Sequence, residues 1–341
     1  MKKKFSWVIP TLAIISAFII FVVYFLTAKV DVLDEKVYLF IYPNTPKSEI
    51  VKTIESQNII INSVAFKVYS VVFKYNKVYS GRYEIEKGMS VAKLVKRLSR
   101  GHQSPIKLII GKSRTKEIFA HTIEKELAFT KKELLAKMND NKFLKEFGVD
   151  SITVISLFIP NTYEVYWNIS AEEFIRRMYK EQEKFWKKRE DKLKEIGYNK
   201  LEVMTIASIV EEETNKNDEK PIVAAVYINR LKKGMLLQAD PTVKFAIGDF
   251  TIKRIIGSML GVNSPYNTYQ NTGLPPSPIC IPSISSIDAV LNYAKNDFIF
   301  FCAREDFSGY HNFTADVQEH YANARKYHKA LNELEMHESI D

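Results

Sequence analysis

One segment of the sequence predicts both a helix and a chemistry: Leu201-Glu-Val-Met-Thr-Ile-Ala-Ser-Ile-Val-Glu-Glu-Glu-Thr214. It is largely apolar until three carboxylates follow in a row. At about 100° per residue, Glu211 shares a helix face with Met204 and Ala207. An apolar face desolvates a carboxyl, and two adjacent carboxylates add like charge, so we expect the pKa of Glu211 to be raised. Such a carboxyl can protonate a glycosidic oxygen. The alternative is a solvated acidic helix end.

The segments after this helix carry polar groups suited to a sugar. A second helix is predicted over residues 222–233. A short strand and turn over residues 235–242 then present Gln238 and Asp240. The loop over residues 264–278 is dense in Tyr, Asn and Pro, so it is stiff and offers stacking and hydrogen-bonding groups. Such a loop indicates either a sugar cleft or a rigid structural turn.

Five motifs in this part of the chain resemble a known family. They are Ala207-Ser-Ile-Val-Glu-Glu-Glu-Thr214, Asn229-Arg-Leu231, Leu237-Gln-Ala-Asp-Pro-Thr-Val243, Ser264-Pro-Tyr-Asn-Thr-Tyr269 and Gly273-Leu-Pro-Pro276. In this order they resemble the MltG/YceG-like endolytic murein transglycosylases, and the resemblance extends over essentially the whole chain. Pro160-Asn-Thr-Tyr163 departs from the family's usual Pro-Asp-Thr-Tyr, and Gly111-Lys-Ser-Arg-Thr115 fits the family's Glu-Gly segment only loosely.

The resemblance implies a reaction and a set of site residues. The family's catalytic Glu is the first acidic residue after Ala-Ser-Ile-Val, which is Glu211. The family cleaves peptidoglycan glycan strands between N-acetylmuramic acid and N-acetylglucosamine without water, leaving 1,6-anhydro ends, with no cofactor. It works beside peptidoglycan synthases, and the expected role is to terminate the elongation of glycan strands. The implied substrate-binding residues are Gln238, Asp240, Thr242, Asn267 and Tyr269, with Glu213 and Ser208 as secondary candidates for the site.

Two other functions stay open at this stage. A hydrolytic muramidase would need a second carboxylate, for which Asp240 or Glu213 is the nearby candidate. A non-catalytic peptidoglycan-binding scaffold would tether the wall to the membrane, although the three carboxylates and the Gln238/Asp240 segment argue against it. Release of anhydro ends, reducing ends or neither from purified sacculi distinguishes the three functions.

The amino terminus predicts a membrane anchor. Three lysines, Lys2–Lys4, precede an uncharged run over residues 5–26, and its 22 residues exceed the about 20 that a bilayer needs. The run is longer than the apolar part of a signal peptide and shows no clear cleavage pattern. By the positive-inside rule the amino terminus stays in the cytoplasm. We therefore expect a single-pass protein of the cytoplasmic membrane whose catalytic part lies outside the cytoplasm.

The exported part predicts an α+β fold of short strands and long helices. Strands are expected over residues 36–42, 80–85 and 105–110, and helices over residues 48–57 and 91–98, the latter capped by Ser90. The unit over residues 83–110 resembles a LysM-like glycan-binding module, and a spacer subdomain is the alternative. Four regions follow: an anchor (1–30), a LysM-like α+β subdomain (31–110), a helical connecting region (111–198) and a catalytic domain (199–341). Within the third, we expect helices over 112–150, a turn at 160–163 and a long charged helix over 170–196.

The composition of the chain limits the classes of partner that it is expected to bind. The net charge of +9 suits an anionic membrane or the cell wall, and no nucleic-acid motif is present. The His and Cys spacings do not fit a metal site. Cys280 and Cys302 are read as two small buried side chains, with a disulfide as the alternative. A last strand is expected over residues 297–303 and a helix over 314–334, with His311 in a structural role rather than in the cleft.

Overall fold

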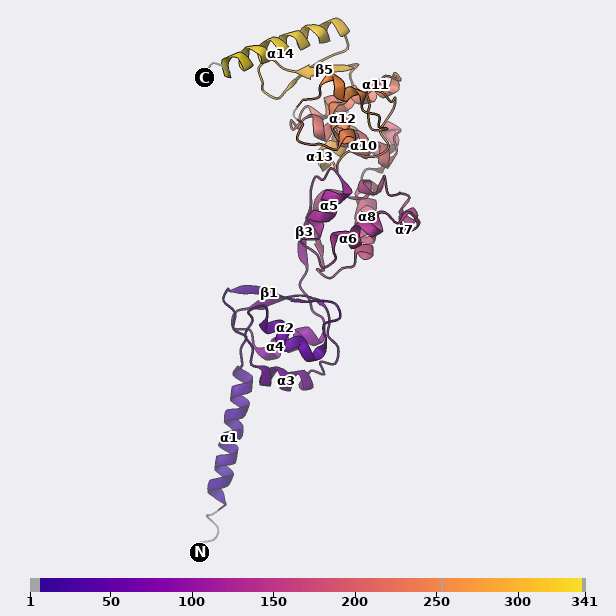
Figure 1. Ribbon diagram of the computed structural model, residues 1–341. Helices are drawn as coiled ribbons and strands as arrows, with labels where there is room; N and C mark the ends of the chain where they lie inside the picture. Colours follow the sequence, from indigo (N-terminus) through magenta and orange to yellow (C-terminus); the bar gives the residue numbers. More distant parts are fainter. Residues whose placement is uncertain (1–6, 253, 339–341) are drawn as a thin grey trace. The chain divides into compact units, whose positions relative to one another are not determined.

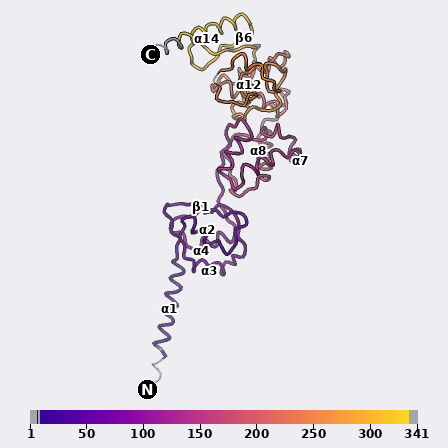
Figure 2. The backbone as a smooth tube through the Cα atoms, in the orientation of Figure 1, coloured from indigo at the N-terminus to yellow at the C-terminus, as the bar shows by residue number. Residues whose placement is uncertain are grey.

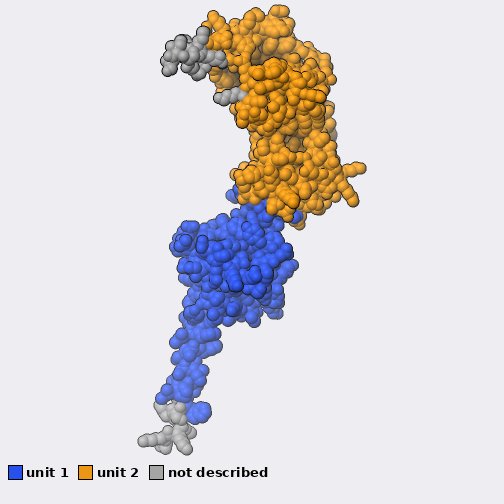
Figure 3. Space-filling view, viewed as in Figure 1, with its two compact units in different colours: residues 1–108, 126–129, 163–170 blue, residues 109–125, 130–162, 171–341 orange. Residues whose placement is uncertain are grey.

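The computed structural model describes residues 7–252 and 254–338. Over these residues the chain is a mixed α+β protein of long helices and short strands, which confirms the predicted class. It divides into two compact units (Figure 3). Unit 1 holds residues 1–108, 126–129 and 163–170, and unit 2 holds residues 109–125, 130–162 and 171–341. The four predicted regions stay a prediction.

Unit 1 begins with the apolar helix α1 (Val8–Thr27). Its segment Ile9–Thr27 has a mean hydropathy of 2.6 and is long and apolar enough to cross a membrane. The end of α1 packs on its own unit, where Phe25 is buried and its carbonyl oxygen accepts a hydrogen bond from the Tyr69 hydroxyl at 3.0 Å. The three lysines expected in the cytoplasm, Lys2–Lys4, lie outside the described residues.

An antiparallel pair of strands organises the rest of unit 1: β1 (Lys36–Ile41) and β2 (Gly81–Glu86). Alternate side chains of both strands point into the core, so Leu39 and Tyr83 are fully buried. The helices of this unit are η1 (Lys47–Glu49), α2 (Ile50–Glu55), α3 (Ser63–Val72) and α4 (Val91–Ser99). Ser90 caps α4 as predicted, and the helix α3 was missed.

The strand pairing differs from the strand–helix–strand unit expected over residues 83–110. Strand β2 pairs with β1, whereas β3 (Ile106–Ile110) forms a two-stranded sheet with β4 (Asn161–Val165). The predicted turn at residues 160–163 is therefore wrong, because pairing with β3 overrides the local turn preference of Pro-Asn. The likeness to a LysM module stays a prediction.

Unit 2 begins with short helices, as expected for residues 112–150. They are α5 (Lys116–Ile123), α6 (Lys131–Met138) and α7 (Asn141–Leu144), followed by η2 (Lys145–Phe147) and η3 (Val154–Leu157). The helix predicted over 170–196 is two helices, α8 (Ala171–Lys187) and α9 (Glu190–Ile196). In Figure 1, α6 lies beside α8.

The core of unit 2 lies among three helices: α10 (Lys200–Glu213), α11 (Lys220–Lys232) and α13 (Ile284–Leu291). Their buried side chains include Ile206, Val210, Ile228 and Val290. Cys280 is also buried, and it is not bonded to Cys302. These three helices hold the segment on which the predicted chemistry depends.

The remaining elements of unit 2 depart from the prediction at two places. The described residues 235–239 form no strand; instead α12 (Asp240–Ile247) begins there, because Pro241 suits a first helical turn. After η4 (Gly257–Gly261), strands β5 (Phe300–Ala303) and β6 (His311–Thr314) pair antiparallel, and β6 was not predicted. Helix α14 (Val317–Glu338) runs beside this hairpin (Figure 2).

Candidate active site

Helix α10 carries the three carboxylates at its end. A capping box starts the helix: the Asn199 side chain accepts from the backbone N–H of Glu202, whose carboxylate accepts from the N–H of Asn199. Every residue over 203–210 is buried, so the helix is enclosed on all sides. Because successive residues turn by about 100°, the three carboxylates that follow point in three directions.

Glu213 lies in the most desolvating of the three environments. The hydroxyl of Tyr227, on α11, donates a hydrogen bond to Oε1 of Glu213 at 2.5 Å. Burial raises the pKa of Glu213 to about 7, against the opposing effect of the Tyr227 hydrogen bond, and the nearby charge of Asp240 raises it further. A substantial share of Glu213 is therefore protonated at neutral pH, as a general acid needs.

Glu213 lines a pocket of about 320 Å³. The lining residues come from α10, α11, α12, β5, α14 and two loops: Glu213, Arg230, Leu237, Gln238, Asp240, Tyr269, Phe301 and His320. Three of the residues expected to bind substrate, Gln238, Asp240 and Tyr269, are therefore in one pocket with a carboxyl that can donate a proton. This set of side chains can perform acid–base chemistry on a polar ligand.

Two contacts hold the polar wall of this pocket. The Tyr269 hydroxyl donates to Oδ1 of Asp240 at 2.6 Å. Arg230 donates from Nη1 to Oε1 of Gln238 at 3.1 Å and also binds the carbonyl oxygen of Leu237 at 2.9 Å. Gln238 has a φ of 52°, a conformation that costs a non-glycine residue about 1–3 kcal/mol and that persists mainly at functional sites.

Comparison with known proteins places the chain in a family. The model of the YceG-like family matches residues 39–326. The chain belongs to the YceG-like family. It is 31% identical over 305 residues to the endolytic murein transglycosylase of Bacillus subtilis (strain 168), covering 84% of this chain and 83% of the relative.

Two further proteins similar to this YceG-like chain support its place in the family. The endolytic murein transglycosylase of Streptococcus pneumoniae (strain D39) is 26% identical over 285 residues, which are 75% of this chain and 52% of that relative. The 2.6 Å crystal structure of a yceG-like protein from Listeria monocytogenes matches with a TM-score of 0.57 and 30% identity. That match covers 84% of this chain and 98% of the other.

Glu211 has a different environment from the one its helix face predicts. Its Oε2 accepts hydrogen bonds from the hydroxyls of Ser283 and Ser286, each at 2.5 Å, and pairs with the ammonium of Lys220 at 3.2 Å. Burial alone would raise the pKa of Glu211, but the two hydroxyls and Lys220 outweigh it and lower the pKa below 4.5. The predicted rise is therefore wrong, and Glu211 is ionised at neutral pH.

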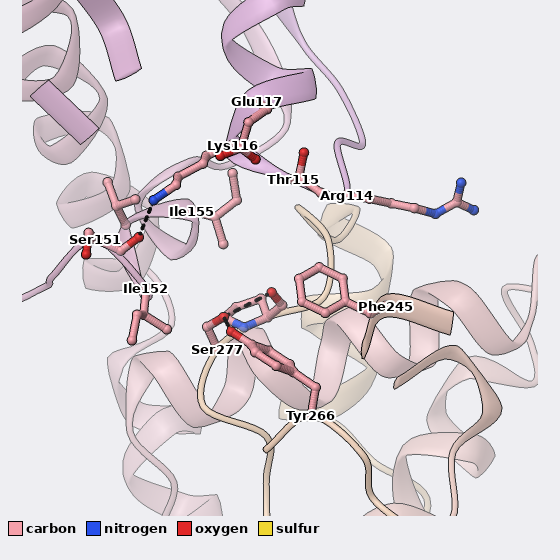
Figure 4. Close-up of a pocket in the computed structure, with 12 residues that line it drawn as sticks. Arg114, Thr115, Lys116, Glu117, Ser151, Ile152, Ile155, Phe245, Tyr266 and Ser277 are labelled. Carbon is pink, nitrogen blue, oxygen red and sulfur yellow. Dashed lines mark hydrogen bonds between the residues drawn. The ribbon is translucent and has the colours of Figure 1, made fainter. Parts of the chain in front are cut away.

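Glu212 is held by cations on the segment before α5. Arg114 binds its carboxylate through two nitrogens, at 3.1 and 2.9 Å, and Lys112 pairs with it at 2.9 Å. Although burial opposes them, these contacts lower the pKa of Glu212. Arg114 also lines a second pocket of about 230 Å³, in which Phe245 and Tyr266 face the segment of Lys116 and Ser151 (Figure 4). The Glu213 pocket shares none of its lining with this one.

Three residues expected at the site are fully buried and serve the backbone. Thr242 bonds the carbonyl oxygen of Ala239 and the hydroxyl of Thr268. Asn267 donates to two carbonyl oxygens of its own loop. Ser208 accepts from the N–H of Ile279 at 3.0 Å. Their exposed fractions are 0%, and none of the three lines the Glu213 pocket.

Sequence reasoning assigned no role to Tyr227, Arg230 or His320. Tyr227 and Arg230 lie one helical turn apart on α11, and Arg230 falls within the Asn229-Arg-Leu231 motif, which was the available signal. His311 serves structure as expected: its backbone N–H and its Nδ1 both bond the buried carboxylate of Glu219, at 2.7 and 3.0 Å.

The Glu211–Lys220 pair generates a stability prediction. Glu211→Gln leaves Lys220, whose side chain is 6% exposed, without its counter-charge, at a cost on the order of 3 kcal/mol. We expect the midpoint of thermal unfolding, followed by circular dichroism in detergent, to fall by several degrees. Because the folded pKa of Glu211 is lowered, the stability it contributes is present above pH 4.5 and is lost as the pH falls further.

Two further variants control this measurement. Glu211→Gln/Lys220→Met removes both charges and should recover most of the loss. Glu190→Gln breaks an exposed ion pair with Lys194 and should change the midpoint little. A double variant no more stable than Glu211→Gln would contradict the structural role of the pair.

Proposed function

We propose that the chain is a membrane-anchored endolytic lytic transglycosylase that cleaves peptidoglycan glycan strands, with Glu213 as its acid and base. Relatives in the YceG-like family carry the name endolytic murein transglycosylase. The observation that carries the assignment of Glu213 is its pKa of about 7 in a pocket that also holds Gln238, Asp240 and Tyr269. Synthases of peptidoglycan are the partners expected beside such an enzyme.

The reaction needs one carboxyl. Protonated Glu213 gives its proton to the oxygen that links C1 of N-acetylmuramic acid to N-acetylglucosamine, and that bond breaks. The resulting carboxylate then takes the proton of the C6 hydroxyl of the same muramic acid, whose oxygen bonds to C1. The product is a 1,6-anhydro end, Glu213 regains its proton, and no water is consumed. The Tyr227 hydrogen bond to Oε1 leaves Oε2 to carry the proton.

Glu213 replaces Glu211 in this role for two reasons. Glu211 is ionised and is tied to Lys220, Ser283 and Ser286, so it has no proton to give at neutral pH. The pocket that contains Asp240 is lined by Glu213 and not by Glu211. Glu211 instead ties the end of α10 to the start of α13, where Ser283 is the N-cap.

A hydrolytic muramidase is the second candidate, and Asp240 is the observation that favours it. Asp240 is an exposed carboxylate in the same pocket as Glu213, so it could activate a water or stabilise a positive sugar ring. The Tyr269 hydroxyl already occupies Oδ1 of Asp240, which fits a positioning role for this carboxylate better than that of a base.

The remaining parts of the proposal concern unit 1. We propose that α1 crosses the cytoplasmic membrane with its amino terminus in the cytoplasm, so that residues after it lie outside. Residues 31–110 would then act as a LysM-like module that holds glycan near the membrane. The antiparallel β1–β2 pair, with α2 and α3 between the two strands in sequence, supports a small independent subdomain.

The catalytic prediction concerns Glu213→Gln. Glutamine keeps the size and the acceptor for Tyr227 but cannot donate or recover a proton. General acid–base groups supply about 10²–10⁴-fold in rate, and one residue serves both steps here, so we expect a loss near the upper end. The measurement is the release of 1,6-anhydromuropeptides from purified sacculi, with circular dichroism to confirm folding.

Glu211→Gln is the matched control, two residues earlier on the same helix. Its rate should fall far less than that of Glu213→Gln, once corrected for the folded fraction. Near-normal release by Glu213→Gln together with none from folded Glu211→Gln would return the acid role to Glu211. Reducing ends from the wild type would show a muramidase instead.

The topology prediction uses a reporter that fluoresces only in the cytoplasm. Fused after Asp341, it should stay dark, because the chain after α1 is exported. The same reporter fused before Met1 should fluoresce. A bright carboxyl-terminal fusion would overturn the proposed orientation.

A further inference from the structure

His320 brings the carboxyl-terminal helix α14 into the Glu213 pocket. It is half-buried, lines the pocket together with Glu213, and was assigned no role by the proposed mechanism. Its ring stacks on that of Phe300, with centroids 5.0 Å apart and planes at 18°. The imidazole is therefore held in one plane at the pocket wall.

The neighbouring structure fixes where this ring sits. Phe300, on β5, pairs in register with Thr314 on β6. The Thr314 hydroxyl donates to Oε2 of Glu319 at 2.5 Å, and the N–H of Glu319 donates to Oδ1 of Asp316 at 2.8 Å. One hairpin thus sets both the stacking partner of His320 and the first turn of its helix. Such support is typical of residues that position a ligand.

The two ring nitrogens of His320 differ in access. Nδ1 is buried and has no hydrogen-bond partner among the residues that the structure describes. Orphaned buried N–H donors are rarer than orphaned acceptors, so the proton belongs on Nε2. Since Nδ1 is closed off, Nε2 is also the nitrogen that a ligand in the pocket can reach.

His320 is a neutral donor rather than a cation. Burial lowers the pKa of His320, and the charge of Arg230 lowers it further. This neutrality suits the proposed chemistry, because a second cation in the pocket, in addition to Arg230, would favour the ionised form of Glu213. A neutral N–H binds a sugar oxygen without that effect.

We propose that His320 is a substrate-binding residue, whose Nε2–H donates a hydrogen bond to a hydroxyl or acetamido oxygen of the glycan in the Glu213 pocket. The proposal rests on the proposed function, since it takes an N-acetylated glycan as the ligand. It assigns to α14 a direct part in the site.

The test uses three substitutions in the full-length chain in detergent. In His320→Gln, the side-chain amide nitrogen can take the place of Nε2. In His320→Asn, the amide nitrogen can take the place of Nδ1. His320→Phe keeps a ring to stack on Phe300 and has no nitrogen. Each is made in the wild type and in the non-cleaving Glu213→Gln background. His328→Phe, an exposed His on the same helix, is the control.

Two readouts are measured. One is binding of peptide-free glycan oligomers, prepared from sacculi with an amidase, to the Glu213→Gln proteins by calorimetry. The other is kcat and KM for 1,6-anhydro release. Losing one hydrogen bond to the ligand should weaken glycan binding by about 10-fold in His320→Phe and His320→Asn. His320→Gln and His328→Phe should bind within about 3-fold of the parent.

Any other order contradicts the proposal. Parent-like binding by His320→Phe would show that no nitrogen is needed. Better retention by Asn than by Gln would assign the contact to Nδ1. Equal loss in all three variants would indicate a purely structural ring. Failure of the wild type to release 1,6-anhydro ends would overturn the proposed function instead, and glycan binding in the Glu213→Gln background would still decide the role of His320.

Discussion

The burial of the Glu213 carboxyl is the constraint on which this site depends. A carboxyl at the end of an enclosed helix loses water, and its neutral form gains relative to its charged form. Tyr227 satisfies one oxygen, so the group stays hydrogen-bonded while its pKa rises to about 7. The strained backbone of Gln238 and the Asp240–Tyr269 contact then place polar groups around a proton that the carboxyl can give and take back.

Three successive carboxylates on α10 show how environment, rather than residue type, sets their roles. Glu211 pairs with a buried lysine and accepts hydrogen bonds from two serines. Glu212 pairs with Lys112 and Arg114, and Glu213 accepts a hydrogen bond from a tyrosine. The sequence predicted Glu211 as the acid, whereas the structure lowers the pKa of Glu211 and raises that of Glu213. Helix periodicity could not distinguish the environments of the three carboxylates, because α10 is buried on every side. The serines that stabilise the ionised form of Glu211 lie about 70 residues further along the chain.

Much of the fold followed from local signals and some of it did not. The apolar run of α1, the Ser90 cap of α4 and the helices α10 and α11 were predictable, because their patterns are local. Strand pairing was not, since β4 and β6 are short strands that exist only through distant partners. Within the site, Gln238, Asp240 and Tyr269, which the sequence predicted to bind substrate, line one pocket. Thr242 and Asn267 belong to the same sequence motifs, but both are buried and hydrogen-bond to backbone carbonyl oxygens.

The central claim is that Glu213, and not Glu211, holds a proton near neutral pH. Titration of the side-chain carboxyl carbons by NMR tests it most directly, with glutamate labelled at that carbon and the two signals assigned from Glu213→Gln and Glu211→Gln. The account predicts a carboxyl titrating at about 7 that disappears in Glu213→Gln, and a Glu211 signal titrating below 4.5. A Glu213 signal titrating near 4.5, or a high-pKa signal that disappears in Glu211→Gln instead, would contradict it.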